Sequence, residues 1–333
     1  MVSNFLVTGG LGYIGSHISI DIIERGDNVI IVDNLVNSKI SVLEKLKLIS
    51  RKSIKFYNLD INNSLTLDKV FKENQIDHVI HLAAYKSVQE SISYPNKYYE
   101  NNIISLLSVL NCMLNNNVNN LIFSSSACVY SKSNSYPVKE NGLITYENTY
   151  SHTKILCENL IEKYVNLNEN LKAISLRYFN PIGSHPSGLI GDFIGKYSTN
   201  IIPSIVKSLK NNNTFKIYGD DYNTEDGFAI RDFIHILDLS IAHLDVVSLF
   251  SDDSRYSVYN VGTGTGTSVK KLFDYFCKYN NLNIGYEICK KRNGDIPVSI
   301  ADVTKINTDL NWFARKSIEE MVIDSYNFYR LNT

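Results

Sequence analysis

Three glycines near the start of the chain restrict its fold more than any other feature. Gly9, Gly12 and Gly15 have the spacing G-x-x-G-x-x-G, directly after the apolar run 4–7 and before a helix-like stretch at 17–25. A strand must turn sharply into a helix here, and a pyrophosphate must be able to approach the backbone N–H groups. The bound anion would then lie at the positive end of the helix. A glycine-rich turn without a ligand has the same spacing, so the context has to decide between the two.

The context favours a dinucleotide. Residues 28–32 form a second apolar run that ends in Asp33, about 20 residues after the glycines. A carboxylate at this position accepts hydrogen bonds from the ribose hydroxyls of an adenosine and would repel the 2′-phosphate of NADP. We therefore expect NAD as the cofactor.

Composition excludes several other classes of protein. The 333 residues suggest about two domains, and the net charge of -1 with 20% charged residues provides no basic surface for nucleic acid. No apolar run approaches the roughly 18 to 20 residues that span a bilayer, and the first strand begins too early to leave room for a signal peptide. The five cysteines are scattered without a C-x-x-C motif, and the seven histidines have no metal-ligand spacing. We expect a cytoplasmic protein that binds neither metal, membrane nor nucleic acid.

The alternation of short β-rich runs with amphipathic segments over the first 180 residues is typical of a parallel sheet covered by helices. Further strands are expected at 54–57, 78–82, 121–123 and 173–176, and helices at 97–115, 149–166 and 317–330. Residues 181–200 are rich in Gly, Pro and Ser and predict a loop. We predict an α/β fold: a Rossmann-type, doubly wound parallel sheet in residues 1–180 and a smaller C-terminal α/β substrate-binding lobe in 181–333, with some crossing of the chain between them.

A tyrosine and a lysine four residues apart point to chemistry. On a helix, Tyr150 and Lys154 share one face, about one turn apart. A free tyrosine has a pKa near 10, and a nearby ammonium together with the positive nicotinamide ring favours the phenolate. Lowering the pKa to about 7 requires about 4 kcal/mol, a plausible demand on two close cations. Such pairs also occur by chance, but this one follows a strand end with Ser126, whose hydroxyl either holds a substrate oxygen or only makes a turn.

These features together resemble the extended short-chain dehydrogenase/reductase family, and the match narrows to the UDP-glucose 4-epimerases. It runs from Leu6 to about Tyr329. Its most specific stretches are TGGLGYIGS at 8–16, DNL at 33–35, YYENN at 98–102, RYFNP at 177–181, HPSG at 185–188, YNTEDG at 222–227 and RDFIH at 231–235.

The resemblance implies an isomerase that keeps NAD bound. Tyr150 would take the proton from the sugar 4-hydroxyl while C4 gives its hydride to NAD⁺. The 4-keto sugar would then turn about its diphosphate link and receive the hydride on its other face. Lys154 would bond the nicotinamide ribose and lower the tyrosine pKa, and Ser126 would hold the 4-oxygen.

The resemblance also implies the residues that bind each ligand. For the cofactor they are Gly9, Gly12, Tyr13, Ile14, Gly15, Asp33, Asn34, Asn37, Ser38, Asp60, Ile61, Leu82, Ala83, Ala84, Lys86, Asn101, Ser124, Tyr150, Lys154, Tyr178 and Phe179. For the UDP-sugar they are Lys86, Ser126, Tyr150, Asn180, Asn200, Arg231, Arg292, Asp295 and Ser299. Arg231 and Arg292 match diphosphate ligands, and guanidinium suits that role because its fork matches phosphate oxygens. A surface ion pair is the alternative for each.

Three residues and one loop depart from the family or vary within it. Ser151 and Ser131 stand where the family usually has glycine, and the loop at 191–199 differs from the usual sequence. Position 299 is a bulky tyrosine in forms restricted to glucose and galactose and small in forms that admit 2-acetamido sugars. Ser299 therefore favours UDP-GlcNAc and UDP-GalNAc as additional substrates, unless it is only an exposed strand residue.

Other functions use the same scaffold. A 4,6-dehydratase needs an Asp-Glu pair just after the strand-end serine, and this chain has Ala127 and Cys128 there. A UDP-glucuronate decarboxylase is disfavoured by the motifs of the second half, and a non-catalytic NAD-binding regulator would not need both Tyr150 and Lys154.

The family commonly dimerises through the two helices expected at 97–115 and 149–166. Their apolar positions are Ile103, Leu106, Leu107, Leu110, Leu156, Leu160 and Ile161. We expect a homodimer, although packing of these residues in the core would explain the same pattern.

Overall fold

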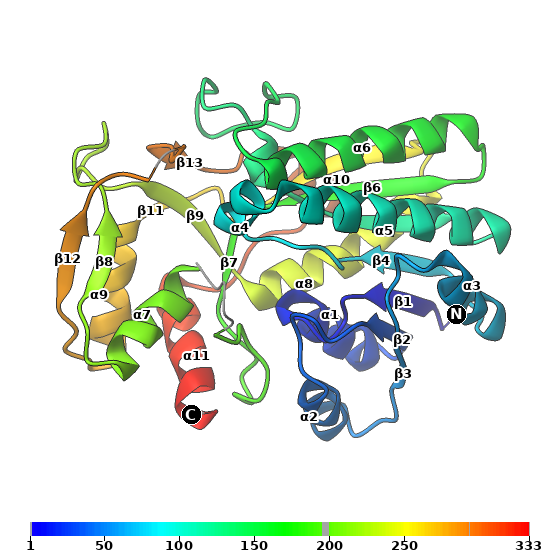
Figure 1. Cartoon of the computed structure of the whole chain (residues 1–333), viewed down its shortest axis with the longest axis horizontal. Helices are drawn as coiled ribbons and strands as arrows, with labels where there is room; N and C mark the ends of the chain where they lie inside the picture. Colours follow the sequence, from blue (N-terminus) through cyan, green and yellow to red (C-terminus); the bar gives the residue numbers. More distant parts are fainter. Residues whose placement is uncertain (1, 195–199, 293, 333) are drawn as a thin grey trace. The chain divides into compact units, whose positions relative to one another are not determined.

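The computed structural model describes residues 2–194, 200–292 and 294–332 (Figure 1). The chain divides into two compact units, each built from three segments. The first contains the chain up to Val129 together with Ile144–Arg177 and Ser240–Tyr259. The second contains Tyr130–Leu143, Tyr178–Leu239 and the chain from Asn260 onward.

Seven strands of the described chain form the large sheet, in the order β10-β6-β5-β4-β1-β2-β3. Their bounds are β1 Asn4–Thr8, β2 Asn28–Asp33, β3 Lys55–Asn58, β4 His78–His81, β5 Asn120–Ser126, β6 Lys172–Tyr178 and β10 Tyr256–Val261. The pairs β1–β2, β1–β4, β2–β3 and β4–β5 are parallel. The order reverses between β1 and β4, which is the switch point where such sheets bind ligands.

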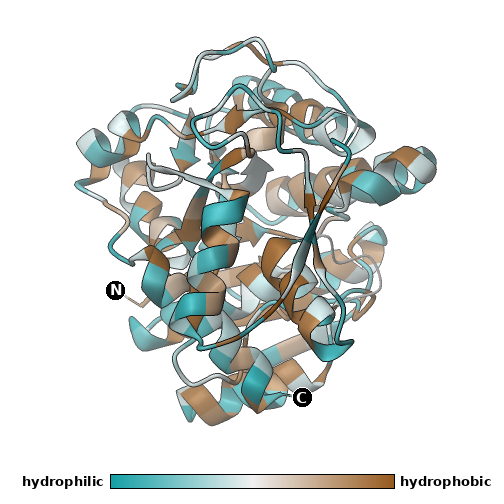
Figure 2. Ribbon diagram, turned by 90° about the vertical axis from the view of Figure 1, so that its left-hand side faces the viewer, coloured by the Kyte–Doolittle hydropathy of each residue, from teal (hydrophilic) through white to brown (hydrophobic). Residues whose placement is uncertain are grey.

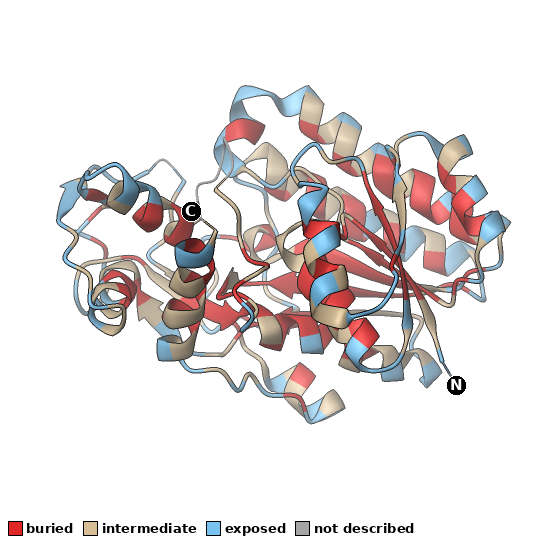
Figure 3. Ribbon diagram, turned by 90° about the horizontal axis from the view of Figure 1, so that it is seen from below, coloured by how far each residue is buried: buried red, intermediate tan, exposed pale blue. Residues whose placement is uncertain are grey.

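The helices of the first unit cover this sheet. They are α1 Tyr13–Glu24, α2 Ser41–Ser50, α3 Ser64–Glu73, α4 Val88–Ser93, α5 Pro95–Asn115 and α6 Thr149–Leu167. Helix α8 (Ile236–Asp245) and the 3-10 helix η2 (Val246–Ser251) follow later in the chain, and the 3-10 helix η1 (Ala127–Val129) follows β5. Buried residues run along the strands of the large sheet (Figure 3). Strand residues such as Leu6, Val79 and Leu121 share one buried core with helix residues such as Leu106 and Ile161. Burial on both faces explains why these strands are almost continuously apolar.

The second unit has smaller sheets. Strands β11 (Gly266–Ser268), β9 (Ile230–His235) and β13 (Val298–Ser299) are neighbours, β7 (Asn180–Ile182) also pairs with β9, and β12 (Tyr286–Cys289) pairs with β8 (Phe215–Tyr218). Its helices are α7 Ile201–Lys210, α9 Val269–Tyr279, α10 Thr304–Leu310 and α11 Ile318–Leu331. Hydrophobic residues lie on one side of these helices (Figure 2), and Val206, Phe276 and Phe328 pack into one core.

The predicted fold class is confirmed, and the structure corrects some of its details. The first helix begins at Tyr13 rather than near residue 17, because Gly12 has extended backbone angles and already serves as its N-cap. Residues 180–182, at the edge of the predicted loop, form strand β7, while 195–199 lie outside the described residues.

One boundary between the two units, at Arg177/Tyr178, lies near the predicted division at residue 180, and the chain crosses between the units in two further excursions. Residues 130–143 belong to the second unit, where Val138 N–H donates to the Ile300 carbonyl at 3.0 Å. Residues 240–259 belong to the first unit, where Ala173 N–H donates to the Arg255 carbonyl at 2.8 Å. Both bonds are made over long sequence distances that no local pattern reveals.

The N-terminus of α11 generates a prediction on acid stability. Glu320 accepts hydrogen bonds from Lys316 Nζ at 2.7 Å and from Ser317 N–H at 2.8 Å, completing a capping box. The hydrogen bond from Lys316, followed by that from Ser317, lowers the pKa of Glu320 from 4.5 to about 2. At pH values above the ordinary pKa of 4.5, ionised Glu320 therefore stabilises the folded state. This contribution is lost as the pH falls toward about 2, the pKa of Glu320 in the folded protein.

We expect Glu320→Gln to lower the free energy of unfolding at neutral pH, and the difference from wild type to shrink as the pH approaches about 2. Urea unfolding of both proteins over this pH range measures the difference. Glu319→Gln is the control, because Glu319 lies in the same helical turn without closing the box. A difference between Glu320→Gln and wild type that does not change with pH would contradict the prediction.

Candidate functional site

The glycine turn leaves no space for side chains. Gly9 has a φ of +68°, and a Cβ added there would lie 3.0 Å from the backbone nitrogen of Ala83. A Cβ on Gly15 would lie 2.7 Å from the Cα of Gly10. Gly9 N–H donates to the Val32 carbonyl at 2.8 Å, which joins the turn to β2. Glycine is therefore required here by both backbone conformation and close approach.

The carboxylate of Asp33 connects this turn to the loop that follows β2. It accepts hydrogen bonds from Leu11 N–H at 3.1 Å, Leu35 N–H at 2.9 Å and Ser38 Oγ at 2.7 Å. Asp33 is buried, whereas Asn34 and Asn37 are exposed on the loop and Ser38 is half-buried. The predicted residues Asp33 and Ser38 thus lie in one hydrogen-bonded group beside the glycines.

The segment after β4 approaches the same turn. Thr8 Oγ1 lies 2.8 Å from His81 Nδ1 and accepts hydrogen bonds from Leu82 N–H and Ala83 N–H at 3.2 and 3.3 Å. Lys86 is exposed, with its Nζ 5.9 Å from the centre of the Tyr13 ring. Four of the predicted cofactor residues (Leu82, Ala83, Lys86 and Tyr13) therefore surround the glycine turn.

Asn102 holds this segment in place from α5. Its side chain accepts from Tyr85 N–H at 2.9 Å and donates to the Tyr85 carbonyl and to Thr153 Oγ1, both at 3.1 Å. The predicted neighbour Asn101 donates to Asn102 Oδ1 at 3.1 Å. Asn102 was not predicted as a site residue, although it lies in the family-like stretch 98–102, which was a signal for it.

Helix α6 carries Tyr150 and Lys154 to the end of β5. Lys154 is buried, and its Nζ donates to the Ser124 carbonyl at 2.6 Å and lies 5.9 Å from the centre of the Tyr150 ring. Tyr150 is half-buried, and its backbone N–H donates to the Oγ of Ser91 at 3.2 Å. The structure thus brings together three of the predicted residues, Tyr150, Lys154 and Ser124.

Burial keeps three titratable groups near Lys154 uncharged near neutral pH. Burial lowers the pKa of His81 to about 3 and raises those of the Cys128 and Cys157 thiols to about 11 and about 12. Burial also lowers the pKa of Lys154, while Cys157, Cys128 and Glu158 oppose that effect. The thiol of Cys128 is therefore a poor acid or base for an elimination.

Two of the departures from the family pattern have a local structural role. Ser151 forms a capping box with Asn148: Ser151 N–H donates to Asn148 Oδ1 at 2.9 Å, and Ser151 Oγ accepts from Asn148 N–H at 3.3 Å. In the second unit, Ser131 Oγ lies 2.8 Å from the Oγ of Ser133. Ser126 Oγ, two residues after Ser124, accepts from Cys128 N–H at 3.2 Å.

A second group of predicted residues lies in the second unit. Arg231 is bonded to Asp295, whose other oxygen accepts from Tyr222 OH at 3.3 Å. Burial and the Asp295 charge raise the pKa of Tyr222 to about 12. Arg292 is exposed, and its guanidinium carbon lies 3.9 Å from the centre of the Tyr218 ring. Neither tyrosine was predicted, although Tyr222 begins the family-like stretch 222–227.

The remaining substrate residues of this unit differ in their surroundings. Ser299 is buried on β13 directly beside Arg231 of β9, so it is not the exposed strand residue considered as the alternative. Asn180 Nδ2 donates to the Asp232 carbonyl at 3.0 Å, and Asn200 Nδ2 donates to Asp192 Oδ2 at 2.7 Å. Two predicted cofactor residues, Tyr178 and Phe179, are buried at the start of the second segment of this unit, and Phe179 N–H donates to the Val261 carbonyl at 3.1 Å.

Residues 5–262 match the model of the NAD dependent epimerase/dehydratase family. The chain belongs to this family. The UDP-glucose 4-epimerase of Dictyostelium discoideum is 39% identical over 98% of this chain and 96% of its own length. The bifunctional protein GAL10 of Pachysolen tannophilus is also 39% identical, and the chain spans 49% of its length. A crystal structure of the UDP-glucose-4-epimerase from Stenotrophomonas maltophila with bound NAD and formylated UDP-arabinopyranose has a TM-score of 0.96 and 36% identity, covering 99% of this chain and 98% of that one.

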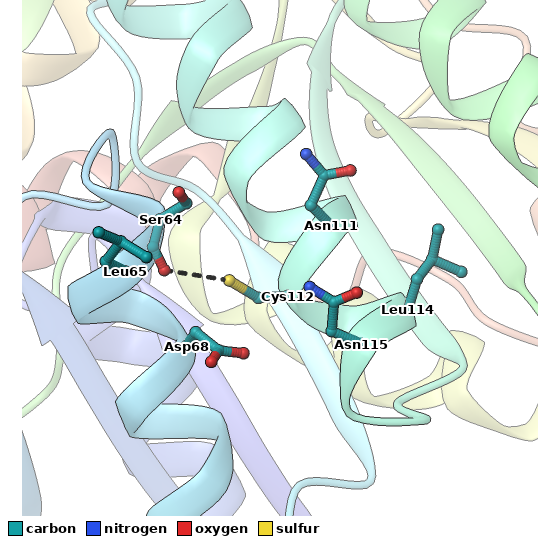
Figure 4. A pocket seen from close by; sticks show the side chains of 7 residues that line it. All are labelled: Ser64, Leu65, Asp68, Asn111, Cys112, Leu114 and Asn115. Carbon is teal, nitrogen blue, oxygen red and sulfur yellow. Dashed lines mark hydrogen bonds between the residues drawn. The ribbon is translucent and has the colours of Figure 1, made fainter.

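The family predicted from the sequence is thereby confirmed. Two further predicted cofactor residues, Asp60 and Ile61, follow β3. Asp60 is exposed and accepts from Asn62 N–H at 2.9 Å, and Ile61 is buried in the core. Figure 4 shows a separate cavity of about 320 Å³ between α3 and α5, where the Cys112 thiol donates to the Ser64 carbonyl. The predicted site residues do not line it. The described part of the chain contains no cluster of three or more His, Cys, Asp or Glu side chains that could bind a metal ion.

Proposed function

We propose that this chain is an NAD-dependent isomerase that epimerises UDP-hexoses at C4, interconverting UDP-glucose and UDP-galactose through a transient 4-keto sugar. The observation that carries this proposal is the arrangement at the end of β5. There the buried Lys154 bonds the Ser124 carbonyl, one helical turn from Tyr150, and Ser126 follows on the same strand end. The relatives described above support the same reaction.

The turn after β1 suits a dinucleotide because added Cβ atoms at Gly9 and Gly15 would collide with backbone. We propose that this turn receives the pyrophosphate of NAD at the N-terminus of α1 and that Asp33 accepts from the adenosine ribose. Bound NAD supplies the hydride acceptor and donor for C4. The other predicted cofactor residues are assigned to the same ligand on the family resemblance.

In the proposed mechanism, Tyr150 removes the proton of the sugar 4-hydroxyl as a phenolate and returns it after the sugar has turned. The ammonium of Lys154 favours the phenolate, because a positive charge nearby stabilises the ionised form. Its bond to the Ser124 carbonyl fixes the ammonium without neutralising it. Ser126 holds the 4-oxygen during the transfer.

We expect Tyr150→Phe to reduce kcat at least a hundredfold while the amount of bound NAD stays unchanged, because only the proton acceptor is removed. The assay converts UDP-galactose without added cofactor and separates the epimers by chromatography, and released NAD is quantified after denaturation. Tyr164→Phe is the matched control on the same helix, where the hydroxyl bonds Asn111 at 3.3 Å. Wild-type turnover by Tyr150→Phe would refute the assigned base.

The second unit supplies the proposed site for the nucleotide part of the substrate. Arg231 and Arg292 would bind the diphosphate, and Asp295 would accept from the uridine ribose. The guanidinium of Arg231 is held in place by Asp295. Asn180, Asn200 and Lys86 are proposed as further contacts on the family resemblance.

We further propose that UDP-N-acetylglucosamine and UDP-N-acetylgalactosamine are substrates. The support is Ser299, a small residue beside Arg231 on the neighbouring strand. A larger side chain at that position would occupy the space that an N-acetyl group needs.

Ser299→Tyr should therefore lower turnover of UDP-N-acetylgalactosamine at least tenfold and leave that of UDP-galactose within about threefold. Ser299→Ala, which keeps the residue small, should retain both activities. The two UDP-sugars are assayed in parallel at high enzyme concentration. A wild-type enzyme that converts UDP-galactose but leaves UDP-N-acetylgalactosamine untouched would disprove the wider specificity.

Two other functions are less well supported. A 4,6-dehydratase needs an acid/base pair that this chain lacks, because Ala127 has no ionisable group and the pKa of Cys128 is raised. A UDP-glucuronate decarboxylase or a non-catalytic NAD-binding regulator would give no C4 epimer in the assay above. The free state of all five cysteines supports a reducing compartment, and we propose the cytoplasm. Across residues 2–194, 200–292 and 294–332, no helix is apolar over the length needed to cross a bilayer.

We propose a homodimer formed through α5 and α6, which lie side by side (Figure 1). The core of the first unit buries Leu106, Leu110 and Ile161. Ile104 on α5, in contrast, is 44% exposed. Light scattering at micromolar concentration should give twice the mass of the 37.8 kDa chain. Ile104→Lys should shift this mass toward the monomer, whereas Leu65→Lys, at an exposed position on α3, should not. A monomeric wild type would contradict the proposal.

A further inference from the structure

Arg177 begins one of the most family-like stretches of the sequence, yet the proposed reaction gives it no role. Its side chain is 3% exposed and forms two bonds with Glu158 of α6: Nε with Oε1 at 2.9 Å and Nη2 with Oε2 at 2.6 Å. A buried pair of this kind carries a large desolvation cost, and apolar residues of similar size often stabilise a fold as well. Its presence therefore calls for a reason other than stability.

The position of Glu158 supplies that reason. Glu158 follows Lys154 by one turn of α6, so both side chains lie on the same face of the helix. Lys154 Nζ bonds the carbonyl of Ser124, and Glu158 Oε1 accepts from the Oγ of the next residue, Ser125, at 2.5 Å. Two residues of α6 one turn apart thus hold two successive residues of β5.

Two attachments to β5 restrict the position of α6 more than either attachment would alone. α6 is bonded to α4 through the N–H of Tyr150 and to α5 through Thr153. Lys154 adds one bond to the end of β5, and the second attachment, through Glu158, fixes the helix at two successive residues of that strand. Arg177 orients the carboxylate from β6, which neighbours β5 in the sheet.

We propose that Glu158 is a positioning residue of the epimerase reaction. Held by Arg177 and Ser125, it sets the axial position of α6 against the end of β5 and thereby the place of the Tyr150 hydroxyl relative to Ser126. This inference rests on the proposed function. Glu158 does not touch the reacting atoms and acts through Lys154 and Tyr150.

The test is Ser125→Ala, which removes the strand attachment and leaves the Glu158–Arg177 pair intact. We expect kcat for UDP-galactose to fall about tenfold, with KM within twofold of wild type and bound NAD retained, because displacement of a reacting group affects the chemical step. The matched control is Ser175→Ala on β6, another buried strand serine, whose Oγ lies 3.1 Å from Tyr256 OH. It should leave both kcat and KM at wild-type values.

A second variant separates positioning from stability. The triple change Ser125→Ala, Glu158→Met and Arg177→Met replaces the group with apolar side chains, and we expect a midpoint of thermal unfolding close to wild type with kcat reduced at least tenfold. Wild-type kcat in Ser125→Ala, an equal loss in Ser175→Ala, or a loss that appears in KM alone would overturn the inference. If the triple variant does not fold, the comparison of the two serine variants still decides. A wild-type protein without epimerase activity would instead refute the proposed function and this inference with it.

Discussion

The buried ammonium of Lys154 is the interaction on which the candidate site depends. A lysine shielded from water keeps its charge only where an acceptor replaces the lost solvation, and here the acceptor is the Ser124 carbonyl at 2.6 Å. That bond requires α6 to lie against the end of β5, and Tyr150 lies one helical turn before Lys154, with its ring centre 5.9 Å from the ammonium. Burial lowers the pKa of His81 to about 3, so its imidazole is neutral near neutral pH and adds no positive charge beside the ammonium.

The turn after β1 is organised by a different constraint. Gly9 and Gly15 leave backbone exposed where any side chain would collide, and Asp33 connects the turn to β2 through Leu11 N–H. Both features come from backbone that is held rigidly by the sheet. A proposed dinucleotide site of this kind has little freedom to lose on binding, which favours a firmly held cofactor. Firm retention is what a reaction that returns its own hydride requires.

Local sequence patterns were sufficient to predict the parallel sheet and its long helices, because apolar runs and helical periodicity are short-range signals. They placed Tyr150 and Lys154 on one helix for the same reason. They missed the start of α1, since glycines obscure a helix N-terminus, and the short strand β7 at 180–182, which exists only by pairing with β9. The Glu158–Arg177 pair was also missed, because the partners come from different elements and the sequence marked only Arg177 as unusual.

In the second unit, the carboxylate of Asp295 bonds two side chains. Arg231 is bonded to Asp295, which also accepts from Tyr222, so the guanidinium is oriented before any phosphate contacts it. A guanidinium has five N–H donors, and the carboxylate leaves several of them available for phosphate oxygens. A diphosphate would therefore add to this group without displacing Asp295, and Asp295 would keep lone pairs for a ribose hydroxyl. The same pairing limits electrostatic affinity for anions in general, because the carboxylate offsets part of the positive charge. Selectivity for a nucleotide diphosphate would then depend on geometry, and Ser299, the residue proposed to select the sugar, lies beside Arg231 on the next strand.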